Sequence, residues 1–191
     1  GEHTGTHFDA PIHWVTGKDL DDVSQVPPAR LVGPAVVLDF AKEAAANPDF
    51  CLDVSHVQAW EKANGAIPKG AWVMFRTGWS KFGDDAKAFA NADENGPHTP
   101  GLTVECAEYF ATKTEILGMG VETVGTDAGG AFGFSMPFPC HTLFLGNNKY
   151  GLTQLRNLDK LPTTGAIVIA APLKIVGGSG SPTRVFALVS K

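Results

Sequence analysis

The first thirteen residues of the chain concentrate side chains that bind metal ions. His3, His7 and His13 are three of the six histidines among 191 residues, and Asp9 lies among them. All four stand at odd positions, so on an extended strand, where alternate side chains point the same way, they would share one face. Imidazole and carboxylate groups together suit Zn²⁺ and Mn²⁺. The pattern therefore predicts a metal site at the start of the chain.

The spacing of these residues limits how the strand can run. Two residues four apart on a straight strand are separated by roughly 13 Å, too far for the imidazoles of His3 and His7 to reach one ion at about 2.0–2.1 Å. Gly5 lies between them and adopts conformations closed to other residues. We therefore expect a strand that bends at Gly5, wraps its polar face around a metal and ends at Pro11. The alternative is that these are ordinary surface histidines, which is the better interpretation for any single one but not for the set.

Composition narrows the class of protein. The net charge is −5 with no basic run, which argues against a nucleic-acid partner. No apolar run approaches the roughly 20 residues of a membrane span, and no signal-peptide pattern is present. The three cysteines form no CxxC pair, so neither a disulfide framework nor a thiolate zinc site is indicated. We expect one globular domain in the reducing cytoplasm, binding neither nucleic acid nor membrane.

Hydrophobic patterning predicts an α/β fold, a mixed sheet with flanking helices. Strands and helices do not alternate strictly, which argues against a Rossmann arrangement. The helix over 53–64 has Asp53 or Ser55 as its N-cap and Gly65 just past its end, and a second helix is capped by Thr103. The expected strands are 31–40, 70–79, 165–175 and 183–190, and residues 116–130 are expected to be a strand leading into a glycine-rich loop. The expected helices are 53–64, 103–113 and 141–148, and residues 80–101 are expected to be a long polar connection.

Two further segments carry candidate functional residues. Cys140 and His141 are adjacent, but neighbouring side chains usually point apart, so a thiol nucleophile with its base is disfavoured. We expect His141 to return to the metal face, and Gln154 to be a solvated helix residue. The glycine-rich stretch 124–134 lacks the Lys-Ser/Thr of a phosphate-binding P-loop. Its Asp127 either orients a histidine or caps the turn, and it is one candidate partner for Arg76, a charge on a predicted buried strand.

The stretch HTGTHFDAPIH resembles the HxGTHxDxPxH signature of the cyclase-like metal-dependent hydrolases, and every position of that signature is matched. The similarity continues through RTGW, GTDA and NLDKLPTTGAIVIAAPLKI, and is strongest to the isatin hydrolases of this family. It implies that His3, His7 and Asp9 bind the catalytic metal, with His13 as the base or as a ligand of a second metal, and with His141 lining the pocket. It also implies a swivelling β/β/α-type domain, usually a homodimer.

The resemblance further implies an activity, hydrolysis of the cyclic amide of isatin to isatinate by metal-activated water. Kynurenine formamidases of the family carry a Glu that helps to hold two zinc ions, and Gln154 stands at that position here. A neutral Gln is a poorer ligand, so we expect one ion. The resemblance to the isatin hydrolases implies that this ion is Mn²⁺ rather than Zn²⁺. The alternatives are a two-zinc kynurenine formamidase, a lactone hydrolase, and a non-catalytic binding module that a metal stabilises.

Two expectations concern the substrate and the extent of the chain. An aromatic substrate would pack on Trp14, Phe8 or Trp79, between which the sequence does not choose. Family members usually carry several dozen residues before the motif, and this chain begins at it. We therefore expect residues 1–191 to be a single domain that lacks this N-terminal segment.

Overall fold

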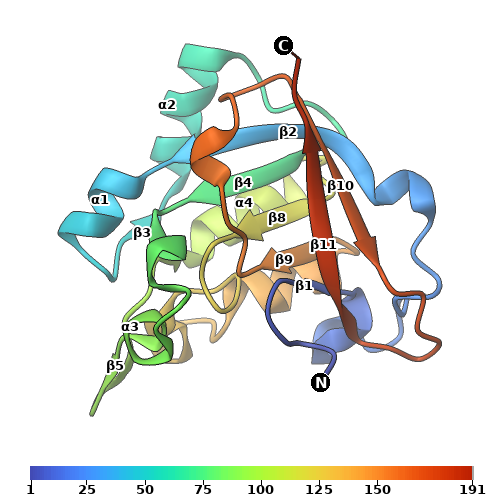
Figure 1. The fold of residues 1–191 in the computed structure, drawn as a ribbon, viewed down its shortest axis with the longest axis horizontal. Coiled ribbons are helices and arrows are strands. Elements are labelled where there is room, and N and C mark those ends of the chain that lie inside the picture. The colour runs from blue at the N-terminus through green and yellow to red at the C-terminus, as the bar shows by residue number, and fades with distance from the viewer. Residues whose placement is uncertain (191) are drawn as a thin grey trace.

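Seven strands close into a mixed barrel in the computed structural model, which describes residues 1–190 (Figure 1). The order around the barrel is β1-β11-β10-β2-β4-β8-β9. The pairs β2–β4, β4–β8 and β8–β9 are parallel, and the other pairs in the barrel are antiparallel. The barrel strands are β1 (His7–Asp9), β2 (Val32–Asp39), β4 (Trp72–Arg76), β8 (Gly118–Val121), β9 (Tyr150–Thr153), β10 (Ala166–Pro172) and β11 (Gly180–Leu188).

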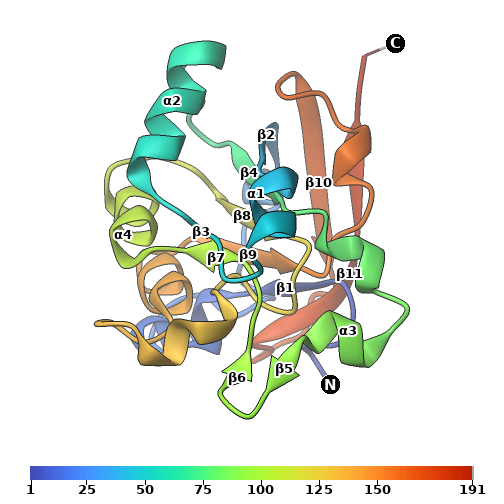
Figure 2. The same cartoon turned by 90° about the vertical axis from the view of Figure 1, so that its left-hand side faces the viewer.

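Helices and two small sheets surround the barrel. Figure 2 shows α2 and α4 on one side of it, with β10 and β11 on the opposite side. The helices are α1 (Ala41–Ala46), α2 (Val54–Asn64), α3 (Ala86–Ala90) and α4 (Val104–Thr112). The small sheets pair β3 (Cys51–Leu52) with β7 (Gly101–Leu102), and β5 (Ala92–Asp93) with β6 (Gly96–Pro97). None of the helices within residues 1–190 combines the length and the apolar character needed to cross a bilayer.

The apolar run in β4 is explained by burial on both faces of the sheet. Trp72 and Met74 belong to the core inside the barrel, whereas Val73 and Phe75 belong to the core between the barrel and the helices. Alternate residues of a strand point to opposite faces, so a strand covered on both sides needs apolar residues at every position. This confirms the mixed α/β sheet with flanking helices that the sequence predicts.

The two main helices begin where the sequence predicts. Asp53 caps α2, because its Oδ1 accepts from the backbone N of His56 at 3.0 Å, and Gly65 follows the helix with a φ of 93°. Thr103 caps α4 in the same way, accepting from the N of Cys106 at 3.2 Å. Both caps satisfy amide groups that have no partner within the helix.

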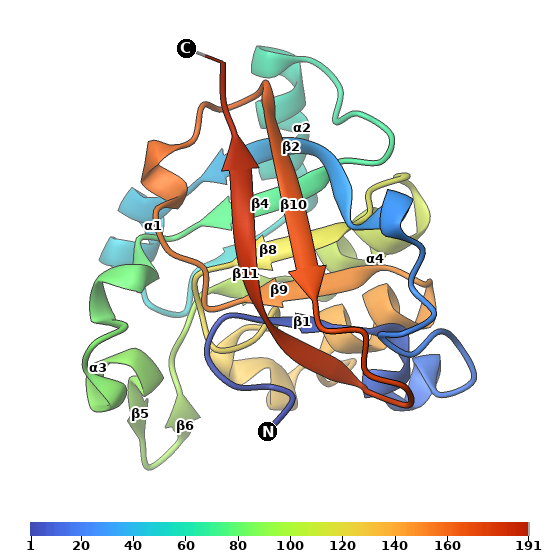
Figure 3. The same ribbon diagram turned by 45° about the vertical axis from the view of Figure 1, so that its right-hand side comes forward.

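Several expectations were wrong. The stretch 80–101 is not only a connection, since it contains α3 and the β5–β6 hairpin that projects from the barrel (Figure 3). The N-terminal strand ends at Asp9, not Pro11, and His13 lies in a 3₁₀ turn, Pro11–His13. Gln154 follows strand β9 and is not helical. Arg76 pairs with Asp39 at 2.5 Å, not with Asp127, because the two residues are register partners on β2 and β4.

Candidate metal centre

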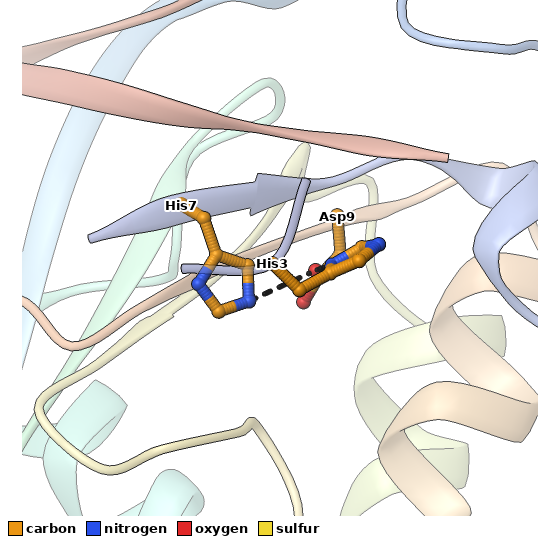
Figure 4. Close-up of side chains that lie close together, drawn as sticks. All are labelled: His3, His7 and Asp9. Carbon is orange, nitrogen blue, oxygen red and sulfur yellow. Dashed lines mark hydrogen bonds and ion pairs between the residues drawn. The ribbon is translucent and has the colours of Figure 1, made fainter. Parts of the chain in front are cut away.

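The strand β1 carries two of the predicted ligands on one face, opposite Phe8. It pairs with β9 on one edge and with β11 on the other, so His7 and Asp9, two residues apart, point the same way. Gly5 has a φ of +61°, a left-handed conformation that favours glycine, and the chain turns there. This confirms the predicted bend, which brings His3 back to the two strand residues (Figure 4).

The three side chains converge on one point. Nδ1 of His3 lies 2.8 Å from Oδ1 of Asp9, and Nε2 of His7 lies 3.4 Å from the same oxygen. One ligand atom from each residue lies within 4.8 Å of the others. His7 and Asp9 are buried and His3 is half-buried. Among residues 1–190, this is the one group of three or more His, Cys, Asp or Glu side chains close enough to share an ion.

Hydrogen bonds on the far side of the imidazoles of His3 and His7 determine which ring nitrogens carry protons. Nδ1 of His7 lies 2.7 Å from the carbonyl oxygen of Gly5, which can only accept, so this nitrogen carries the proton. Nε2 of His3 lies 2.9 Å from Oγ of Ser179. If Nδ1 of His7 and Nε2 of His3 carry the protons, the unprotonated Nε2 of His7 and Nδ1 of His3 both face a carboxylate oxygen of Asp9. Such a group of acceptors is complementary to a cation, and it fits a divalent metal with two imidazole ligands and one carboxylate.

The space around Asp9 also suits a fixed ligand. Its register partner on β9 is Gly151, and a Cβ added to Gly151 would lie 2.7 Å from Oδ2 of Asp9. The same Cβ would lie 3.2 Å from Cγ2 of Thr126. The carboxylate therefore occupies the space that any other residue at position 151 would fill.

The charges in the cluster stabilise one another. Burial of Asp9 opposes its ionisation, but without a metal the facing nitrogens of His3 and His7 donate hydrogen bonds that outweigh burial and hold its pKa below the usual value; a cation bound there would take the place of those protons. Burial likewise disfavours the charged form of His7, yet the hydrogen bond and the negative charge of Asp9 raise its pKa. Asp9 is thus a carboxylate at neutral pH.

Two further histidines border the cluster, as expected. The ring of His13 stacks on that of His3 with 3.9 Å between centroids, and lies 5.5 Å from that of His141. Burial, with the neighbouring histidines, lowers the pKa of His13 to about 4. His141 is also buried, which lowers its pKa, but its hydrogen bond to Asp127 outweighs this and the net shift is upward. The two imidazoles therefore differ in basicity although they are neighbours.

Asp127 does both things that the sequence left open. Its Oδ2 lies 2.5 Å from Nδ1 of His141 and accepts from the backbone N of that residue at 3.1 Å. Its Oδ1 accepts from the N of Cys140 at 2.6 Å, so it caps the turn as well. The Cys140 thiol is fully buried, and burial raises its pKa well above the usual value, which agrees with the rejection of a thiol nucleophile.

One of the three candidate aromatic residues lies at this site. The ring of Trp14 is 4.7 Å from that of His141 and 5.6 Å from that of Phe138. Phe8 is buried in the barrel core against Tyr150, and the indole of Trp79 donates to the carbonyl oxygen of Phe89. Trp14 remains a candidate for contact with a substrate.

Gln154 lies near the bend at Gly5. It has a φ of 54°, its N donates to the carbonyl oxygen of Thr123 at 2.9 Å, and its own carbonyl oxygen accepts from Oγ1 of Thr6 at 2.7 Å. It lines a cavity of about 180 Å³ together with Gly5 and Glu122. Its place in the metal set stays a prediction.

Sequence reasoning missed the residues that surround the ligands. Thr153 places its Oγ1 3.0 Å from Nδ1 of His7, and Ser179 contacts His3. Ser179 lies in the stretch GGSGSP, between the expected strands 165–175 and 183–190, and the strand containing Thr153 was not predicted. Nothing in their local patterns signals a role near a metal.

Comparisons with known proteins agree with this geometry. A family model described as putative cyclase matches residues 1–128. The chain is 53% identical over 193 residues to an isatin hydrolase of Roseibium aggregatum, covering all of this chain and 73% of the relative. It is 31% identical over 185 residues to a kynurenine formamidase of Salinibacter ruber, covering 95% and 74%. A crystal structure of an isatin hydrolase bound to the product analogue thioisatinate superposes with a TM-score of 0.97 at 52% identity, covering all of this chain and 73% of that one.

Proposed function

The chain belongs to the cyclase family, and we propose that it is a metal-dependent amide hydrolase that opens the cyclic amide of isatin to isatinate. The observation that carries the proposal is the convergence of His3, His7 and Asp9 in a chain 53% identical to an isatin hydrolase. The proposed substrate is a small aromatic amide. The proposed metal is Mn²⁺, with Zn²⁺ as the alternative.

Each of the three ligands would contribute one atom, Nδ1 of His3, Nε2 of His7 and a carboxylate oxygen of Asp9. When bound there, a divalent cation acidifies water and draws electron density from a carbonyl oxygen. Gln154 is proposed as a neutral addition to the set. Because it brings no charge, the site favours a single dication over the two of a zinc formamidase.

The chain's own histidines would move the protons. Hydrolysis adds the hydroxyl group of water to the carbonyl carbon and a proton to the nitrogen, as the carbon–nitrogen bond breaks. His13, with a pKa of about 4, is unprotonated at neutral pH and can take the proton of the attacking water. His141, whose pKa Asp127 raises, can hold a proton for the departing nitrogen. Neighbouring groups with pKa values shifted in opposite directions suit an acid and a base.

Trp14 would bind the aromatic ring of the substrate. It stands beside His141, and Phe138 extends the aromatic surface. Aromatic pairs of this kind contribute about 0.5–1.5 kcal/mol beyond the burial of their area.

Three further proposals follow from the family resemblance. Residues 1–191 would form a single domain, the protein would act as a homodimer, and it would work in the cytoplasm. Sedimentation of the purified protein tests the dimer.

The test is turnover by purified protein carrying one equivalent of Mn²⁺. The absorbance of isatin should decay well above the buffer rate, and the His13→Ala and His141→Ala variants should lose most of this activity. His98→Ala, at a half-buried histidine outside the cluster, is the matched control and should keep it. Isatin left intact by the loaded protein would overturn the substrate assignment, and a fully active His13→Ala would overturn the role of that base.

The same assay separates the alternatives. Two zinc ions per chain, with turnover of N-formylkynurenine, would identify a formamidase. Unfolding on chelation, with no amide, formamide or lactone turned over, would identify a metal-stabilised binding module.

A further inference from the structure

The loop between β10 and β11 returns to the start of the chain and contacts a proposed metal ligand from behind. Oγ of Ser179 lies 2.9 Å from Nε2 of His3 and donates to Oε2 of Glu2 at 2.7 Å. The backbone N of Ser179 donates to the same carboxylate oxygen at 2.9 Å. The carbonyl oxygen of Ser179 accepts from the N of Ala10 at 3.0 Å, which joins the loop to the residue after β1.

The direction of these hydrogen bonds follows from the number of protons available. A carboxylate has no proton to give, so the single hydroxyl proton of Ser179 is donated to Glu2. The same oxygen can then only accept from His3, and Nε2 of His3 must carry a proton. With its proton on Nε2, His3 can offer the lone pair of Nδ1, the nitrogen that lies 2.8 Å from Asp9, to a cation held there.

The ring of His3 is also held in place from its sides. A Cβ added to Gly180 would lie 2.4 Å from Cε1 and 2.9 Å from Nδ1 of His3, so the ring packs directly on the backbone after Ser179. The ring of His13 stacks on His3 at 3.9 Å. The β10–β11 loop thus sets the position of the Nε2 proton of His3, while Gly180 and His13 hold the plane of its ring.

His7 provides an internal comparison. Its outer nitrogen bonds to a backbone carbonyl, that of Gly5, which no substitution removes. The corresponding partner of His3 is a side chain that Glu2 orients. The main chain therefore fixes the imidazole of His7, whereas side chains fix that of His3. Substitutions can remove the hydrogen bond behind His3 but not the one behind His7.

We propose that Glu2 and Ser179 are positioning residues that hold His3 as the tautomer protonated at Nε2, and that they thereby set the affinity of the centre for its metal. Without the serine hydroxyl, the proton of neutral His3 would move to Nδ1 and donate to Asp9. A metal would then have to displace that proton before it could bind. The inference rests on the metal centre of the proposed function, and not on the identity of the substrate.

The test compares variants that remove and retain the hydroxyl. Ser179→Ala should weaken Mn²⁺ or Zn²⁺ binding about 10–100-fold, the usual effect of removing a group that orients a metal-bound histidine. Glu2→Ala should weaken it less, because the hydroxyl remains, and Ser179→Thr should restore affinity close to the wild type. Ser55→Ala is the matched control, since it removes an equivalent bond of 2.6 Å from a serine hydroxyl on α2 to the carboxylate of its N-cap, Asp53. Affinities would come from competition with a chelator.

A second measurement reports the tautomer itself. Long-range proton–nitrogen NMR of metal-free protein, labelled with ¹⁵N-histidine, distinguishes protonated from bare ring nitrogens. Nε2 of His3 should be protonated in the wild type and in Ser179→Thr, and bare in Ser179→Ala. A change in the fold alone would not move this proton from one nitrogen to the other.

The outcomes separate this inference from the proposed function. Wild-type affinity together with an unchanged tautomer in Ser179→Ala would overturn the inference and leave the proposed hydrolase intact. A tautomer that changes in Ser179→Ala, with weaker metal binding, supports it even if isatin is never hydrolysed. A wild type that binds neither metal would overturn the proposed metal centre and the affinity role together.

Discussion

The substitution Gly151→Ala should damage the metal centre without damaging the fold. A Cβ at this position would lie 2.7 Å from Oδ2 of Asp9, and ordinary contact begins at 3.4 Å, so the two atoms must separate by about 0.7 Å. Asp9 has little freedom to move, because His3 and His7 contact its other oxygen and the new Cβ would also lie 3.2 Å from Thr126. Ligand distances in metal sites hold within about 0.2 Å, so the shift exceeds what the site tolerates.

The expected effect follows from that displacement. Metal affinity should fall about 10–100-fold, and turnover with saturating metal should also fall, since a misplacement of 1 Å costs on the order of 10²-fold in rate. Alanine is favoured over glycine in a strand by roughly 0.5–1 kcal/mol, which offsets part of the strain, so the melting temperature should change little.

A chelator titration, an isatin assay and a thermal melt measure these three effects. Gly130→Ala is the control, because a Cβ there meets nothing within 4 Å. A Gly151→Ala protein that matched this control in metal affinity and in turnover would refute the argument that Asp9 is fixed by the absence of a side chain opposite it.

Three other predictions follow from the site and its surroundings. Removal of the metal by a chelator should lower the melting temperature, since an ion at 100 times its dissociation constant stabilises the folded state by about 2.7 kcal/mol; an unchanged melt would argue against a bound ion. Asp127→Asn should reduce turnover at least about 100-fold by releasing His141, with metal affinity retained in the titration. His98 has a raised pKa because it bonds to Asp49 and Asp93, so its contribution to stability is full below pH 6.5 and is lost as the pH rises through the raised pKa. His98→Asn should therefore flatten the melting temperature between pH 5 and 8, and an unaltered slope would contradict this.

The elements that the sequence predicted correctly are those with a strong local signal. Asp53 marks the start of α2 and Gly65 marks its end. Both could be predicted because a side-chain cap and a glycine with positive φ act within a few residues of the helix ends. The continuous apolar run of β4 reflected burial on both faces. By contrast, β9 is only four residues long and contains a glycine, so its pairing between β8 and β1 has no local signature. Closure of the sheet into a barrel is likewise a property of pairs far apart in sequence.

The same distinction applies to the site. His3, His7 and Asp9 could be grouped from their spacing and the bend at Gly5, because all of them lie within seven residues. Their environment could not, since Ser179 lies 176 positions from His3 along the chain. His13 was expected on the same strand face, yet it reaches the cluster from a 3₁₀ turn, because Pro11 at the first position of that turn ends the extended run.

Barrel closure and the proposed metal centre share two residues, His7 and Asp9. Strand β1 is the only link between β9 and β11 in the closed order of strands within the described chain, and a strand this short makes few ladder hydrogen bonds. Two of its residues, His7 and Asp9, are proposed ligands, and Asp9 has the glycines 151 and 180 as its register partners. Glycine contributes no side chain to sheet packing, so these pairings are weak on their own. An ion that joins β1 to His3, which contacts Ser179 just before β11, would therefore add a connection between β1 and the start of β11.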